Sequence, residues 1–132
     1  MKKLPIYFLV PLIALVSACS PTDSQVESRG TDYIRNNLND PHSGNFRNVY
    51  LSNVKSEGRS KDAYVCGEVN AKNLFGAYVG YSLFYVHVSA DTRFLIPYLG
   101  IAHGESDDGI VDINANERTK SLQYLEYEKR CK

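Results

Sequence analysis

Residues 63–88 hold the densest run of β-branched and aromatic side chains in this chain of 132 residues. Two runs rich in Val, Tyr and Phe, residues 63–71 and 77–88, flank residues 72–76, which contain the Asn and Gly typical of turns. Such side chains favour strands because they pack well on a pleated surface. The pattern predicts a β-hairpin at the centre of the fold.

Alternation along the first run divides its side chains between two faces. One face is apolar and carries Val65, Gly67, Val69 and Ala71, whereas the other is polar yet carries Cys66. The second run is largely apolar on both faces, which is typical of a central strand that is covered on both sides.

Weaker patterns on either side of the hairpin predict the remaining elements. A short amphipathic helix is expected from residue 31, or a few residues earlier, to Leu38, because Asn39-Asp40-Pro41 ends it. Strands are expected at 46–54 and 93–99, and solvated loops at 55–62 and 100–109. Pro97 indicates an edge position for the later strand, since proline donates no backbone hydrogen bond.

The C-terminal residues predict a second helix that begins near Ala115. Asn114 is expected to cap it, with Glu117 three residues later. The residues expected to face the sheet are Tyr124, Tyr127 and Cys131, broadened by Leu122 and Leu125. The chain is therefore predicted to form an α+β domain: a small antiparallel sheet of about four strands around a central hairpin, packed by an N-terminal and a C-terminal helix.

The first 18 residues are typical of an export signal. Lys2 and Lys3 precede an apolar segment, residues 4–16, which is too short for a transmembrane helix. Val16-Ser17-Ala18-Cys19 then resembles the lipobox of bacterial lipoproteins, in which the cysteine is lipidated. Ordinary cleavage after Ala18 is the alternative.

Three cysteines divide between an anchor and a disulfide. In an oxidising compartment Cys66 and Cys131 can pair, which leaves Cys19 as the odd cysteine at the cleavage site. Two free thiols are the alternative to the pair. The resemblance to lipoproteins implies a diacylglycerol and an amide-linked acyl chain such as palmitate on Cys19, and Ser20 after it implies the outer membrane.

These signals divide the chain into three segments. We expect a signal peptide at 1–18, a lipidated polar tether at 19–29 and a single domain at 30–132 that faces the periplasm. The polar residues of the tether are also compatible with a frayed helix start.

A dispersed motif resembles a group of small exported bacterial proteins. Its pieces are Asp40-Pro41-His42-Ser43, Phe46-Arg47-Asn48-Val49 and VCGEVNAKN at 65–73, with Gly76, Tyr78 and Gly80 following. The resemblance covers about residues 31–88. It supports the fold and the compartment, and it implies no activity and no catalytic or binding residue.

Charge excludes a common class of partner. Two of the 15 basic residues lie in the signal, so the expected mature chain carries 13 basic and 15 acidic residues, a formal net charge of −2. No basic stripe is present either. Nucleic acid is therefore not an expected partner.

Motifs for catalysis and metal binding are missing or incomplete. The sequence has no nucleophile elbow, nucleotide-binding loop or paired-histidine zinc helix. Four possible ligands lack His or Cys spacing: His103, Glu105, Asp107 and Asp108. Residues 112–116 resemble the start of a calcium loop, but Glu117 and Gln123 replace its required Gly and Glu. We therefore expect no enzyme, no metal and no cofactor.

The strongest functional signal lies at the hairpin turn. Leu74 and Phe75 are unusual there, and they either fold back onto the domain or form an exposed apolar tip. The possible partner surface consists of Asn70, Lys72, Asn73, Leu74, Phe75 and Tyr78.

The sequence therefore predicts an outer-membrane lipoprotein with a small periplasmic binding or envelope-accessory domain. Its expected partners are the membrane, through the N-terminal lipid, and an envelope protein. The alternative is a mobile-element-encoded envelope protein that blocks phage entry or neutralises a toxin.

Overall fold

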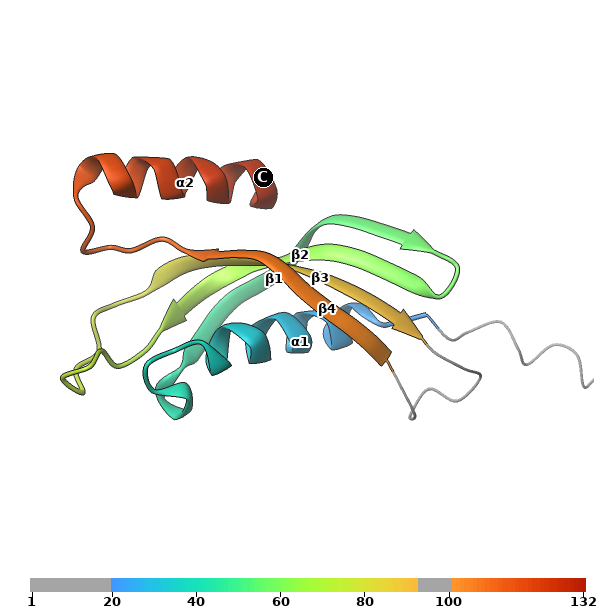
Figure 1. Ribbon diagram of the computed structural model, residues 1–132, viewed down its shortest axis with the longest axis horizontal. Coiled ribbons are helices and arrows are strands. Elements are labelled where there is room, and N and C mark those ends of the chain that lie inside the picture. Colours follow the sequence, from blue (N-terminus) through green and yellow to red (C-terminus); the bar gives the residue numbers. More distant parts are fainter. Residues whose placement is uncertain (1–19, 93–100) are drawn as a thin grey trace, which may run out of the picture.

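The computed structural model describes residues 20–92 and 101–132, with only the backbone described at 101–103. Four antiparallel strands form one sheet in the order β1-β2-β3-β4 (Figure 1): β1 Asn45–Glu57, β2 Ser60–Asn70, β3 Ser82–Thr92 and β4 Ile101–Ile110. Helices α1 (Asp23–Asn36) and α2 (Glu117–Cys131) lie on opposite faces of the sheet, and a 3-10 turn, η1 (Pro41–Ser43), precedes β1. The predicted α+β fold and its central hairpin are confirmed.

Helix α1 begins at Asp23, earlier than the start expected at Thr31 or a few residues before it. Thr22 caps it in a capping box, because the Thr22 hydroxyl accepts a hydrogen bond from the Gln25 N–H at 3.3 Å and the Gln25 side chain accepts one from the Thr22 N–H at 2.9 Å. Residues 23–29, which overlap the expected tether, are therefore helical.

Helix α1 packs on the apolar face of the sheet. The buried residues of this core are Val26, Ile34, Ala63, Val65, Val69, Phe84, Val86, Val88 and Ala90. Gly30 allows the helix to approach closely, since a Cβ atom there would lie 2.5 Å from a methyl carbon of Val65. The predicted apolar face of β2 is thus the face that α1 covers.

A smaller core lies between the sheet and α2. It consists of Cys66, Val111, Tyr127 and Cys131, flanked by Tyr64, Leu83 and Tyr85. Leu122 and Leu125 are 57% and 59% exposed, so the prediction that they broaden the buried face is wrong. Only a narrow stripe of the helix, near Tyr127 and Cys131, reaches the sheet.

The cap of α2 also differs from the prediction. Asn116, and not Asn114, accepts the capping hydrogen bond, from the Thr119 N–H at 2.9 Å. The Asn114 N–H instead donates to the Asp112 carboxylate at 2.9 Å and forms a local turn. The helix consequently starts two residues later than expected.

Residues 55–62 were expected to form a charged loop, yet most of them belong to strands. β1 and β2 stay paired as far as Glu57 and Ser60, so that only Gly58 and Arg59 make the turn. Gly58 has a φ of 58°, which glycine adopts without strain. Charged side chains are compatible with this pairing because those of β1 are exposed here, and Lys61 of β2 forms an ion pair with Asp23 at 2.6 Å.

The prediction of a loop at 100–109 is also wrong, because these residues form most of β4. The residues of this segment have a weak strand propensity. Backbone hydrogen bonds with β3 nevertheless hold the segment as a strand. The strand expected at 93–99, with Pro97, lies outside the described residues. β3 begins at Ser82 and not at residue 77, which leaves residues 71–81 as a long connection.

Candidate functional site

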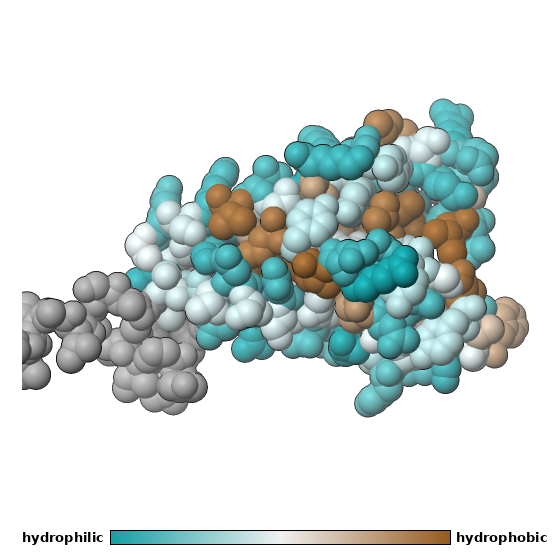
Figure 2. Space-filling view, turned by 180° about the vertical axis from the view of Figure 1, so that it is seen from behind, coloured by the Kyte–Doolittle hydropathy of each residue, from teal (hydrophilic) through white to brown (hydrophobic). Residues whose placement is uncertain are grey.

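Residues 71–81, which we call the tip loop, join β2 to β3 and carry two highly exposed apolar side chains. Leu74 and Phe75, the apolar tip, are 82% and 94% exposed. Of the two expected possibilities, the structure therefore has the exposed tip. From behind, hydrophobic residues gather over the middle of the molecule and toward the end that carries the tip loop, at the right of Figure 2.

Asn73 holds the tip loop in shape. Its side-chain oxygen accepts hydrogen bonds from the Phe75 and Ala77 N–H groups, at 2.9 and 3.1 Å. Its own N–H donates to the Ala77 carbonyl and its carbonyl accepts from the Gly76 N–H, both at 2.9 Å. Since these polar groups are satisfied within the loop, the apolar tip sits on an ordered turn.

Cations stand over two tyrosines of the same loop. The Lys72 Nζ lies 5.7 Å from the centroid of the Tyr78 ring, and the Arg47 guanidinium carbon lies 3.6 Å from that of Tyr81. Asn70, at the end of β2, accepts a hydrogen bond from the loop backbone at 3.2 Å. The structure thus brings the six residues of the predicted partner surface together in or beside one loop.

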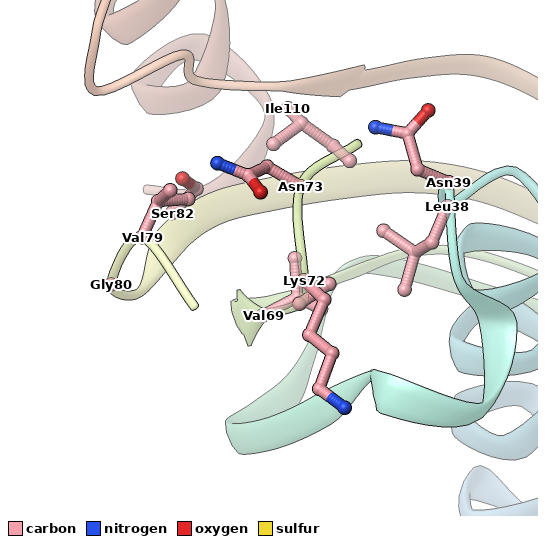
Figure 3. A pocket seen from close by; sticks show the side chains of 10 residues that line it. Leu38, Asn39, Val69, Lys72, Asn73, Val79, Gly80, Ser82 and Ile110 are labelled. Atoms are coloured by element: carbon pink, nitrogen blue, oxygen red, sulfur yellow. The ribbon is translucent and has the colours of Figure 1, made fainter. Parts of the chain in front are cut away.

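A hollow of about 160 Å³ lies at the base of the tip loop. Leu38 and Ile110 enter it from two sides, and Val79 and Gly80 border it from the loop (Figure 3). Pockets for small ligands usually measure about 300–1,000 Å³. The hollow is a seam beneath the loop, and the apolar tip does not line it.

A second candidate region lies on the face of the sheet that carries α2, because this helix covers only one half of that face (Figure 1). A hollow of about 490 Å³, which we call the open hollow, is lined by Asn53, Lys55, Asp62, Tyr64 and His87. The open hollow is not predicted from the sequence, because residues 55–62 were expected to form a loop. The available signal is the alternation of Ser60, Asp62, Tyr64 and Cys66 on one face of β2.

Hydrogen bonds to Asp107 fix the wall of the open hollow beside α2. Arg130 donates to both carboxylate oxygens of Asp107 at 2.8 Å, and the Tyr64 hydroxyl donates to one of them at 2.6 Å. The hydrogen bonds from Arg130, followed by the one from Tyr64, hold the pKa of Asp107 below its usual range. The hydrogen bond between Tyr64 and Asp107 also raises the pKa of Tyr64. The Arg130 guanidinium also lies 4.7 Å from the ring centroid of Tyr85.

His87 lies between Ser106 and Asp62 in the open hollow. Its Nδ1 is 3.4 Å from the Ser106 hydroxyl, and its Nε2 is 3.9 Å from the Asp62 carboxylate. These are the residue types of a hydrolytic triad, but 3.9 Å is longer than a hydrogen bond. The carboxylate therefore does not orient this imidazole as a triad requires.

The residues considered as metal ligands have other partners or lie apart. Asp107 binds Arg130 and Tyr64, and Asp108 accepts a hydrogen bond from Tyr33 at 3.1 Å. Glu105 and His103 lie on β4, and the side chain of His103 is outside the described part of the chain. Within that part, no three His, Cys, Asp or Glu side chains gather as metal ligands would.

The cysteines that were predicted to pair lie at disulfide-bonding distance. The Cα atoms of Cys66 and Cys131 are 6.0 Å apart, and both residues are buried. Cys19 and the signal residues 1–18 lie outside the described residues, so lipidation stays a prediction. Within residues 20–92 and 101–132, no helix has the length and apolarity needed to cross a bilayer.

Comparison with known protein families, with curated proteins and with solved structures finds no match to this chain.

Proposed function

We propose that this protein is a lipid-anchored protein of the outer membrane whose periplasmic domain binds an envelope protein through the apolar tip. The exposure of Leu74 and Phe75, at 82% and 94%, carries the proposal. Single apolar side chains are common on protein surfaces, whereas two apolar neighbours beside tyrosines are typical of recognition surfaces.

The order of the tip loop supports this role. Asn73 fixes the turn through hydrogen bonds within the loop, so the apolar tip needs little further ordering when it meets a partner. Preorganisation of this kind favours binding because less conformational entropy is lost.

The position of the apolar tip relative to the expected lipid anchor also supports the proposed binding role. Helix α1 starts at one end of the molecule, and the tip loop lies at the opposite end (Figure 1). Pro21 is buried, so a lipid on Cys19 would hold the start of α1 next to the membrane. The apolar tip would then point away from that membrane and toward the periplasm.

A photo-crosslinking amino acid at position 75, introduced in intact cells, tests the binding role. We expect an adduct with one envelope protein, lost when Leu74→Ser is added. Position 59, in the exposed turn between β1 and β2, is the matched control and should give no such adduct. The same adduct from both positions, or none from position 75, would show that the tip binds no protein partner.

Stability measurements separate binding from folding. Replacing Leu74 and Phe75 with Ser should change the free energy of unfolding by less than about 0.5 kcal/mol, because both side chains are exposed. A larger loss would mean that the tip serves the fold.

The anchor has its own test. Cys19→Ser should release the protein from membranes, and a labelled fatty acid should enter the wild type but not the variant. A wild-type protein that takes up no label would contradict the lipoprotein assignment and leave the test of the tip unaffected.

A further inference from the structure

The open hollow holds opposite charges that do not meet. Lys55 and Asp62 are direct cross-strand partners on β1 and β2. Such positions place Cβ atoms about 4.5–5.5 Å apart, and opposite charges there normally pair. Among the described residues, however, Lys55 makes no ion pair, and Asp62 instead approaches His87 at 3.9 Å.

The walls of the open hollow are fixed without using these charges. The Tyr64 hydroxyl donates to Asp107 at 2.6 Å, and the Asn53 amide donates to the Arg130 carbonyl at 2.9 Å. The hollow, at about 490 Å³, falls within the usual size of small-ligand sites. A cation and a carboxylate therefore face a preformed space and retain hydrogen-bonding capacity.

We propose that the open hollow binds a free amino acid, with the ligand carboxylate at Lys55 and the ligand ammonium at Asp62. Both contacts are charge-assisted hydrogen bonds, the stronger kind in proteins. An amino acid carries its two charges on neighbouring groups, so it can bridge two side chains that lie side by side yet do not touch. A ligand with a single charge satisfies only one of them. This site is separate from the apolar tip.

A nitrogen-15 NMR titration of the purified protein tests the site with glycine, the smallest amino acid. We expect saturable shifts confined to the amides of residues 53–55, 62–64 and 87. Acetate and methylammonium each carry one of the two charges, and each should bind at least about tenfold more weakly.

Variants then identify the groups that bind. Lys55→Met and Asp62→Asn should each weaken glycine binding at least about tenfold. Lys129→Met removes an exposed lysine of α2 and should leave the affinity unchanged. Thermal unfolding of each variant, compared with the wild type, shows whether a loss of binding reflects a loss of folding.

Three results would overturn the proposal. The first is the lack of saturable shifts up to about 10 mM glycine, well above an ordinary weak dissociation constant. The second is acetate binding as tightly as glycine, which would make the hollow a simple anion site. The third is saturable binding that both variants retain while they stay folded.

Discussion

The two faces of the sheet are held in different ways. On the α1 face, a continuous core that includes Val26, Ile34 and Phe84 is buried between helix and strands. On the α2 face, Tyr127 and Cys131 are the buried residues of the helix, and a disulfide and hydrogen bonds supply much of the attachment. A face held by burial has to be covered along its length, whereas a face held by cross-links can stay open. This difference leaves room for the open hollow.

Polar contacts complete the attachment of α2. The Tyr50 hydroxyl lies 3.1 Å from the Tyr127 hydroxyl and donates to the Cys131 carbonyl at 3.0 Å. Burial, followed by the hydrogen bond with Tyr50, raises the pKa of Tyr127 well above its ordinary value. The shift favours the neutral form of Tyr127, as expected for a phenol in a small buried cluster.

Loss of the disulfide should give the largest effect on the α2 face. Cys66 and Cys131 are 65 residues apart, so Cys131→Ser should lower the free energy of unfolding by roughly 4 kcal/mol in the chain-entropy model. Urea unfolding of wild type and variant measures the difference. An unchanged midpoint, or two reactive thiols in the native wild-type protein, would show that the disulfide does not hold α2.

The Cys131→Ser variant should also show a difference in local stability between the two faces of the sheet. Because α1 packs through an apolar core that does not include the disulfide, amides of β2 and β3 should exchange hydrogen more slowly than those of α2 in Cys131→Ser. Equal loss of protection in both regions would mean that the faces unfold as one unit.

Acid should weaken the α2 face through Asp107. Hydrogen bonds from Arg130 and then Tyr64 lower the pKa of Asp107 in the folded state. Such a carboxyl stabilises the fold fully above its unfolded pKa, about 3.9, and this contribution is lost as pH falls through the lower folded pKa. The side chain is 42% exposed, so the effect should stay below about 1 kcal/mol.

The measurement compares wild type with Asp107→Asn. Below a pH of about 4, the free energy of unfolding should fall more steeply in the wild type, because the variant has no proton to gain at this position. Parallel curves for the two proteins would show that the Asp107 network does not contribute to the attachment of α2.

The sequence predicts the α1 face better than the α2 face, for a physical reason. Alternation in β2 identifies Val65 and Val69 as core residues because apolar burial leaves a periodic pattern. On the α2 face, Asp107 and Arg130 meet through β4, and nothing in their spacing along the chain indicates this contact.

Irregular backbone in β1 explains further differences between the fold predicted from the sequence and the structure. Asn48 and Asn53 have φ values of 51° and 53°, and each lies at a register shift of edge strand β1. Asparagine tolerates this left-handed region, but its presence does not require it. The bulges, and with them the direction of β1 beside the open hollow, follow from tertiary pairing. Leu74 and Phe75, in contrast, stand out in the sequence because they lie between turn residues, but the sequence does not decide whether they fold back onto the domain or form an exposed tip.

The smallest effect should come from the outer side of α2. Leu125 is 59% exposed and Ile34 of α1 is 1% exposed, so the same truncation to Ala tests the two helices directly. Ile34→Ala should cost about 2–5 kcal/mol because it leaves a cavity in a packed core, whereas Leu125→Ala should stay within about 0.5 kcal/mol. Urea unfolding of both variants provides the measurement. A large loss in Leu125→Ala would place this leucine in the core and make both faces depend on burial, whereas a negligible loss leaves the outer side of α2 free of any role in folding.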